Sequence, residues 1–268
     1  MFKKTLLLAT VAALLLASGA VQAKEGYPAA YSGRPLTLLE STHQIGLDVG
    51  LGLNSGRVAK DIKLNLDYTY GLSDNFQLGA LIEALDYSDG RGTSTAFGGA
   101  TIFGRYTFMP YLGLDFGVYF PGDRTYVDKF GDQLVGLFIG VPAQYIIFEN
   151  MLKVHGGLTA DVSFVNKDYV LTSGGESFQV DLMLDYGLSY NPIEMLFIDL
   201  SSGATLAIYP TGNFGDRVVI PVALTVGGTL VDGDLDVYLR FMFDDLGGSP
   251  GVGAADQRTL WLGAKFRI

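Results

Sequence analysis

The chain has 268 residues, of which 49% are hydrophobic and 17% are charged, with 36 glycines and no cysteine. This composition excludes intrinsic disorder, which requires low hydrophobicity and high charge, and the absence of cysteine excludes disulfide frameworks and thiolate chemistry. A formal charge of −10 disfavours nucleic acid as a partner, because the phosphate backbone would be repelled. With only two histidines, His43 and His155, the sequence predicts no metal site and no cofactor.

The N-terminus predicts a secretory signal peptide over residues 1–23. An apolar run, residues 5–21, follows Lys3 and Lys4 and closes with the small-residue pattern Val21-Gln22-Ala23. A transmembrane anchor is the alternative, and it is disfavoured because the run is short and lacks a stop-transfer pattern. Removing residues 1–23 takes away two lysines and moves the formal charge to −12. We therefore expect an exported bacterial protein.

After this run the apolar residues occupy alternate positions. No later stretch reaches 18 consecutive apolar residues, so the sequence predicts no transmembrane helix. Over residues 45–53, five apolar side chains alternate with three glycines and Asp48. Successive side chains of a β-strand point to opposite faces, so this pattern predicts a strand with one apolar face. The same pattern predicts twelve strands, at residues 45–53, 62–70, 76–83, 100–108, 112–120, 135–141, 152–164, 178–189, 196–201, 218–226, 235–243 and 260–268.

The connections between these strands alternate in length. Short turns are predicted at residues 73–75, 109–110, 149–150, 191–194 and 231–233. The other connections are mostly longer, at residues 86–97, 121–132, 165–177, 209–217 and 244–258, and only 54–57 is short. An even number of strands with short turns at one end and long loops at the other is typical of an all-β, transmembrane antiparallel up-and-down β-barrel of the bacterial outer membrane. We predict the barrel at residues 42–268 and an N-terminal periplasmic segment at 24–41, which either enters the pore or trails into the periplasm.

Backbone chemistry supports this prediction. Lipid offers no hydrogen-bond partner, so a membrane-spanning sheet must close on itself. A soluble β-sandwich also alternates and is the alternative, but the almost uncharged apolar face and the signal peptide favour a barrel surrounded by outer-membrane lipid. Aromatic residues near the strand ends predict interfacial girdles, formed by Tyr68, Tyr70, Phe76, Tyr106, Phe108, Phe120, Phe164, Tyr190 and Phe243.

Two prolines interrupt the pattern. Pro142 and Pro221 lie inside predicted strands, where proline cannot donate a ladder hydrogen bond. We predict a β-bulge at each.

The layout of the chain resembles that of bacterial outer-membrane β-barrel proteins. The last strand, residues 260–268, resembles the C-terminal signal read by the barrel-assembly machinery, although here the terminal residue is Ile268 and the aromatic is Phe266. The segments Arg34-Pro35-Leu36-Thr37-Leu38 and Tyr70-Gly71-Leu72-Ser73-Asp74-Asn75-Phe76-Gln77-Leu78-Gly79 resemble a putative transporter family associated with the MetA pathway of phenol degradation. This resemblance covers about the first third of the chain and implies a channel or transporter. It assigns no functional residues.

The charged residues gather on the face opposite the apolar one. We predict that the pore is lined by Asp48, Lys63, Asp67, Glu83, Arg105, Asp115, Lys153, His155, Asp161, Asp181, Asp185, Asp199, Asp236, Arg240, Lys265 and Arg267. Acids outnumber bases in this set, so a polar pore with mild cation preference is one interpretation. Interior salt bridges that stiffen the barrel are the other, and both stay open because twelve strands enclose a narrow lumen.

Two further expectations concern this inward face. If the barrel closes, Asp48, Asp236, Arg240, Lys265 and Arg267 meet on one wall, as a solvated charge network. Glycines are frequent on the face, including Gly46, Gly50 and Gly79, and argue against a lumen filled by bulky side chains.

The sequence predicts no enzyme. His155 could act as a base near Lys153 or Asp161, but no catalytic motif accompanies it. We expect an outer-membrane channel for passive passage of small polar solutes. A structural or adhesion barrel acting through its loops is the alternative, and a barrel enzyme acting on lipid or peptide is the third. The oligomeric state stays open.

Overall fold

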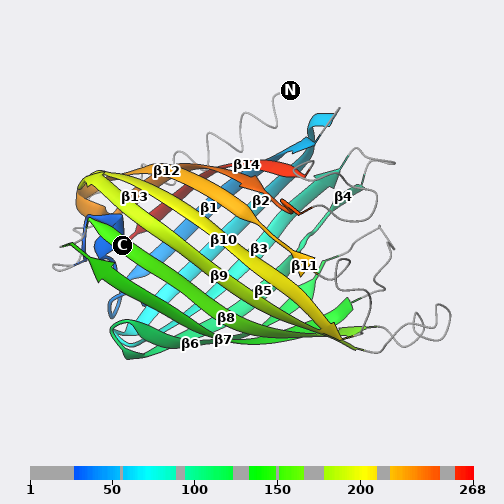
Figure 1. The fold of residues 1–268 in the computed structure, drawn as a ribbon, viewed down its shortest axis with the longest axis horizontal. Helices are drawn as coiled ribbons and strands as arrows, with labels where there is room; N and C mark the ends of the chain where they lie inside the picture. Colours follow the sequence, from blue (N-terminus) through cyan, green and yellow to red (C-terminus); the bar gives the residue numbers. More distant parts are fainter. Residues whose placement is uncertain are drawn as a thin grey trace.

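A computed structural model describes residues 27–54, 57–88, 94–122, 133–148, 151–165, 178–209, 218–247 and 257–268. These residues form one antiparallel β-sheet that curls into a barrel (Figure 1). The strands of the wall are β1 (His43–Asn54), β2 (Arg57–Ser73), β3 (Phe76–Ser88), β5 (Gly99–Met109), β6 (Leu112–Pro121), β7 (Gln133–Ile147), β8 (Leu152–Val165), β9 (Phe178–Ile193), β10 (Leu196–Tyr209), β12 (Val222–Leu230), β13 (Leu235–Phe243) and β14 (Arg258–Arg267). Two short strands are added, β4 (Ser94–Ala96) beside β3 and β11 (Val218–Val219) beside β10.

Strands that follow one another in the wall pair with one another, and the last strand closes the barrel against the first. The register of β14 on β1 sets Arg267 opposite Gln44 and Leu260 opposite Leu51. The predicted twelve-stranded, antiparallel, up-and-down barrel is therefore confirmed. Within the described residues, no helix has the length and apolar character needed to cross a membrane.

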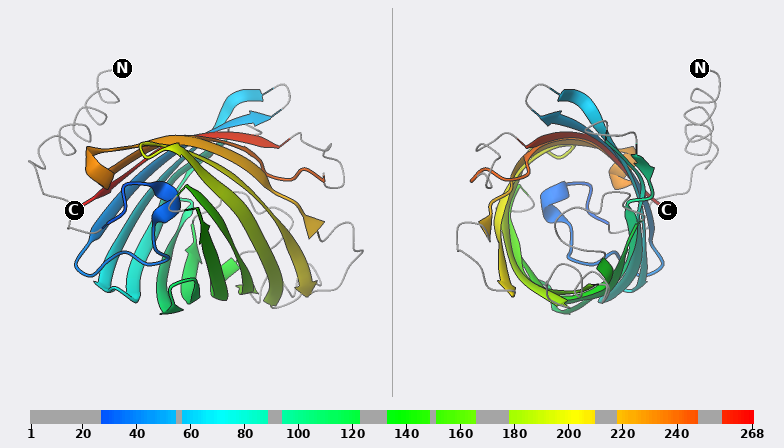
Figure 2. Two further views of the ribbon diagram at one scale, coloured as in Figure 1. Left: turned by 60° about the vertical axis from the view of Figure 1, so that its left-hand side comes forward. Right: turned by 90° about the vertical axis from the view of Figure 1, so that its right-hand side faces the viewer.

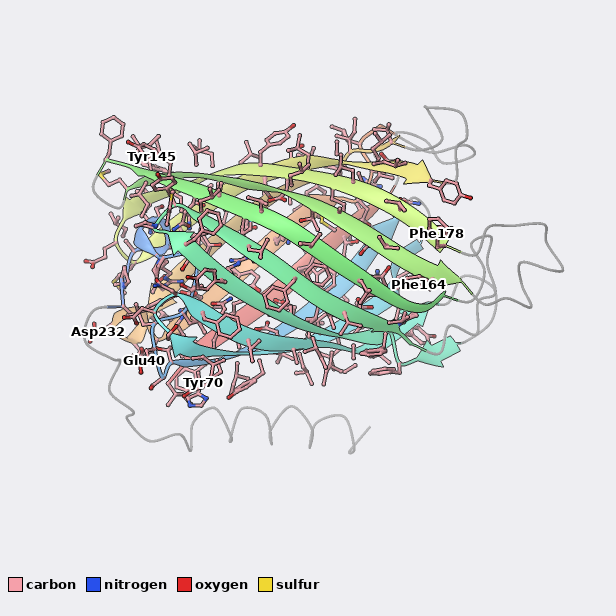
Figure 3. All side chains as sticks on the ribbon, turned by 90° about the horizontal axis from the view of Figure 1, so that it is seen from below. Glu40, Tyr70, Tyr145, Phe164, Phe178 and Asp232 are labelled. Atoms are coloured by element: carbon pink, nitrogen blue, oxygen red, sulfur yellow. The ribbon has the colours of Figure 1, made fainter. Side chains whose placement is uncertain are left out.

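The outer surface of the barrel is apolar. On β7, for example, Leu137, Ile139 and Val141 are 49%, 55% and 43% exposed, and the residues between them face the interior. Such a continuous apolar exterior does not occur on a soluble sandwich, which would bury this face in its core. Aromatic side chains stand near both ends of the wall, with Tyr70 and Tyr145 at one end and Phe164 and Phe178 at the other (Figure 3).

The two ends of the barrel differ in their connections. The end here named the turn end carries the short links between β2 and β3, β5 and β6, β7 and β8, β9 and β10, and β12 and β13. The opposite end, here named the loop end, carries the other connections, most of which lie outside the described residues. The predicted turn at residues 149–150 also lies outside them.

The predicted bulges at the two prolines are wrong. Pro142 pairs with Gly157 of β8 in an unshifted register, and on the β6 side two pairs are absent without insertion of a residue. Pro221 separates β11 from β12, yet both strands keep one register on β10. In each case the missing N–H removes ladder pairing locally, while the neighbouring strands hold the register.

The inward glycines are covered rather than open. Trp261 lies across its cross-strand partner Gly50, where an added Cβ would be 2.8 Å from the indole ring. Phe103 lies across Gly79 and Phe138 across Gly117 in the same way. At these three positions the absence of a side chain on glycine therefore gives room to a ring from the neighbouring strand. That the lumen is not filled by bulky side chains stays a prediction.

Candidate pore and its N-terminal segment

Residues 27–42, here named the N-terminal segment, lie inside the ring of strands at the turn end (Figure 2). A tight turn over residues 39–42 reverses the chain from β1 back into the barrel. Ser41 has a φ of 61°, and its N–H donates to the carbonyl of Gly71 at 2.7 Å. A side chain at Gly71 would collide with the Leu39 carbonyl, so glycine is required for this close approach.

Strand side chains hold the main chain of the segment. Gln144 of β7 donates to the Arg34 carbonyl at 3.1 Å, and Arg105 of β5 donates to the Leu36 carbonyl at 2.9 Å. The N–H groups of Ser32 and Leu38 donate to Asn191 of β9 and Gln77 of β3, at 2.8 and 2.7 Å. These bonds satisfy backbone groups that the segment, having no regular structure of its own over most of its length, would otherwise bury unpaired.

Tyr31 anchors the segment against β8 and β10. Its ring stacks on Phe197 with centroids 4.3 Å apart, and the Lys153 ammonium lies 4.8 Å from the ring centroid. Burial raises the pKa of Tyr31 to about 12, with a further contribution from the Asp199 carboxylate. The phenol therefore stays neutral at physiological pH.

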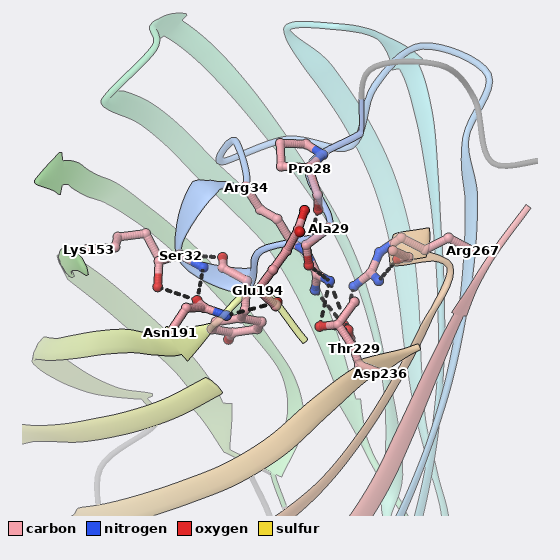
Figure 4. Close-up of polar contacts among 12 residues, drawn as sticks. Pro28, Ala29, Ser32, Arg34, Lys153, Asn191, Glu194, Thr229, Asp236 and Arg267 are labelled. Carbon is pink, nitrogen blue, oxygen red and sulfur yellow. Dashed lines mark hydrogen bonds and ion pairs between the residues drawn. The ribbon is translucent and has the colours of Figure 1, made fainter. Parts of the chain in front are cut away.

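Arg34 is the most strongly bound side chain of the segment (Figure 4). Its guanidinium makes a bidentate ion pair with Asp236 of β13, at 2.5 and 2.8 Å. Arg267 of β14 donates to the same carboxylate at 2.6 Å, and the arginines and the aspartate are at most 5% exposed. Because its carbonyl is bound to β7 and its guanidinium to β13, Arg34 bridges walls that are nearly opposite in the strand order.

The predicted cluster on β13, β14 and β1 forms only in part. Asp236 and Arg267 meet, and Lys265 is the cross-strand partner of Asp236. Asp48 instead accepts a hydrogen bond from Tyr238 at 2.5 Å, and Arg240 donates to the Met242 sulfur at 3.5 Å. The network is also buried at Asp236 rather than solvated.

His155 is paired with a carboxylate and not with a nucleophile. Its Nε2 lies 2.8 Å from Asp199 Oδ1, and the Ser189 hydroxyl donates to the same oxygen at 2.5 Å. A serine nucleophile would need its hydroxyl on the histidine, so this geometry does not match a Ser-His nucleophilic site. Neither Lys153 nor Asp161 is hydrogen-bonded to His155.

The other predicted pore residues are distributed along the wall. Arg105 and Asp115 form a bidentate pair at 2.6 and 2.7 Å, which supports the interpretation of interior salt bridges. Asp161 accepts hydrogen bonds from Tyr119 and Ser163 and faces Asp181 across the strands. By strand partner, Lys63 lies opposite Gly50, Asp67 opposite Gly46, Glu83 opposite Asn65 and Asp185 opposite Gly157. That any of these residues lines a conducting path stays a prediction.

Sequence reasoning missed Arg34, Tyr31, Gln77, Gln144 and Asn191. Gln77 is an uncharged polar residue on the inward face of a predicted strand, which alone distinguishes it weakly. Gln144 lies beyond the end predicted for its strand, and Asn191 lies in a predicted turn, so the alternation assigns neither to the inward face. Arg34 lies in the segment quoted for its family resemblance, but nothing in a sequence places it next to Asp236.

Comparisons with known proteins support the fold. No family model matches the chain, and no curated protein matches it. The COG4313 outer membrane channel from Pseudomonas putida F1 aligns with a TM-score of 0.58 at 13% identity, over 92% of this chain and 99% of that one. The KdgM porin in complex with disordered oligogalacturonate aligns with a TM-score of 0.51 at 10% identity, over 82% and 98%. At such identities the likeness shows the fold alone, and the chain has the fold of bacterial outer-membrane β-barrel proteins.

Proposed function

We propose that this protein is an outer-membrane channel through which small polar solutes diffuse along a narrow, mildly acidic lumen. The observation that carries the proposal is the closed twelve-stranded wall with an apolar exterior and charged side chains on its inward face. Such a wall needs lipid outside and tolerates water inside. In this arrangement the turn end faces the periplasm and the N-terminal segment lies across the periplasmic mouth.

The residues found at the candidate site favour transport over catalysis. His155 is hydrogen-bonded to the Asp199 carboxylate and not to a serine hydroxyl. Among the described residues, no group of three His, Asp or Glu is arranged to hold a metal. The two proteins compared above are named as a porin and a channel. A channel needs only the wall and its charges.

Conductance in planar bilayers tests the proposal. We expect purified protein to give steady single-channel currents, and a variant lacking residues 27–38 to give larger ones, because the segment and Arg34 narrow the mouth. An unrelated outer-membrane barrel with a sealed lumen, purified in the same detergent, serves as the control for currents caused by detergent. If the variant lacking the segment carries no current although its barrel is folded, the channel function is wrong.

A further inference from the structure

Asp236 is held in place by partners other than Arg34. Thr229 Oγ1 donates to its Oδ1 at 2.9 Å, and Arg267 Nη2 donates to its Oδ2 at 2.6 Å. Arg267 is itself fixed, because its Nη1 donates to the Gly233 carbonyl at 2.9 Å. The carboxylate edge that meets Arg34 is therefore also oriented by side chains of β12 and β14, although Arg267 in turn packs on the Tyr27 ring of the N-terminal segment at 5.1 Å.

The group that fits this edge is planar and carries parallel donors. Arg34 Nη1 and Nη2 each donate to one oxygen of Asp236, and Nη2 also lies 3.2 Å from Thr229 Oγ1. A guanidinium supplies this fork, whereas an ammonium is a point charge that cannot match both oxygens in one plane. Tyr27 and Tyr31 flank the guanidinium, with ring centroids 5.6 and 5.3 Å from its central carbon.

Arg34 also organises the segment that carries it. Its Nε and Nη2 donate to the carbonyls of Pro28 and Ala29, both at 3.3 Å. The guanidinium therefore ties the start of the segment to Asp236 and to residues 28 and 29 at once. The other ties from the wall to the main chain at residues 31–38 are single hydrogen bonds.

We propose that Asp236 and Thr229 form a guanidinium-binding site inside the barrel, and that Arg34 occupies it as the latch that keeps the N-terminal segment across the mouth. The inference rests on the proposed channel function and adds its regulation. A solute with a guanidinium group competes with Arg34 for the site, so such solutes act on the channel differently from other cations of equal charge.

The emptied site provides the first test. In Arg34→Gly we expect a larger conductance than in the wild type, and guanidinium chloride or arginine methyl ester added at the turn-end side should reduce it again. Because guanidinium reaches both carboxylate oxygens and ammonium does not, guanidinium should block at roughly tenfold lower concentration than ammonium, and arginine methyl ester at roughly tenfold lower concentration than lysine methyl ester. Adding Asp236→Asn to Arg34→Gly should abolish this difference. Equal block by guanidinium and ammonium would overturn the proposal.

Arg240→Gly is the matched control. It removes an arginine side chain from β13 whose guanidinium donates to the Met242 sulfur and makes no ion pair with Asp236 within the described residues. We expect neither guanidinium block nor release of the segment in this variant. If Arg34→Gly does not fold, the same block by guanidinium is measured in Arg34→Lys, since lysine keeps the positive charge but lacks the pair of parallel donors.

A labelling experiment separates the latch from the channel function. The chain has no cysteine, and Ser32 is fully buried. Ser32→Cys provides a single thiol, which should react slowly with a membrane-impermeant maleimide when Arg34 is present and at least several-fold faster in Arg34→Gly. Faster labelling without any current would leave the latch standing and refute the channel. Unchanged labelling and unchanged current in a conducting barrel would refute the latch.

Discussion

At the scale of single residues, the lumen depends on glycines placed next to rings. Gly227 lies opposite Phe197, which is 1% exposed and pinned by the stacked ring of Tyr31. A side chain at Gly227 would meet this ring, whereas at Gly228 the nearest atom to an added Cβ is 3.5 Å away. The sequence pattern predicts which face each glycine is on, but the ring that covers it comes from a neighbouring strand and from the register.

These two adjacent glycines give a matched pair of substitutions. We expect Gly227→Ala to lower the free energy of unfolding by about 1–3 kcal/mol, because the new methyl group would overlap the buried Phe197 ring, which is stacked on Tyr31. Gly228→Ala should be neutral or stabilise by about 0.4–1 kcal/mol, since it reduces the entropy of the unfolded chain. Urea titration in phospholipid vesicles measures both values. Equal losses for the two variants would contradict the packing argument.

At the scale of elements, strands and the N-terminal segment differ in how far they can be predicted. Period-two alternation predicts β1, β6 and β13 closely, because one apolar face against lipid constrains every second residue. The segment has no such periodicity, and its place is set by polar partners such as Gln77 and Asn191 on distant strands. Strand ends were also underestimated, since β7 and β10 continue beyond their alternating cores.

Hydrogen exchange tests how the segment is held. The Leu38 amide depends on a side-chain acceptor, Gln77 Oε1, whereas the Ser41 amide depends on the Gly71 carbonyl. In Gln77→Ala we expect the Leu38 amide to exchange about tenfold faster, as loss of one hydrogen bond of roughly 1.4 kcal/mol implies. The Ser41 amide is the internal control and should not change. Joint acceleration of both amides would mean that the segment opens as one unit.

At the scale of the whole molecule, the barrel sets charged side chains of neighbouring strands side by side on its inward face. Arg105 is paired with Asp115, and Asp236 with both Arg34 and Arg267, so neither group adds negative charge to the lumen. Asp161 and Asp181 lie directly opposite each other, and the side chains that donate to Asp161, namely Tyr119 and Ser163, are neutral. Like charges at facing positions destabilise a sheet unless water or counter-ions screen them. The pair is therefore one part of the described wall where an excess of negative charge acts on the lumen.

Ion selectivity follows from this excess. We expect the wild type to prefer potassium over chloride, and Asp181→Asn to reduce that preference by roughly two- to fivefold, because a unit charge about 4 Å from an ion contributes about 1 kcal/mol in water. Asp232→Asn removes the same charge from an exposed position at the turn end and should leave the permeability ratio unchanged. Reversal potentials in a potassium chloride gradient measure the three proteins under identical conditions. If Asp232→Asn shifts the reversal potential as much as Asp181→Asn does, the surface potential at the mouth sets the selectivity. A preference for chloride in the wild type would contradict the proposal of an acidic lumen.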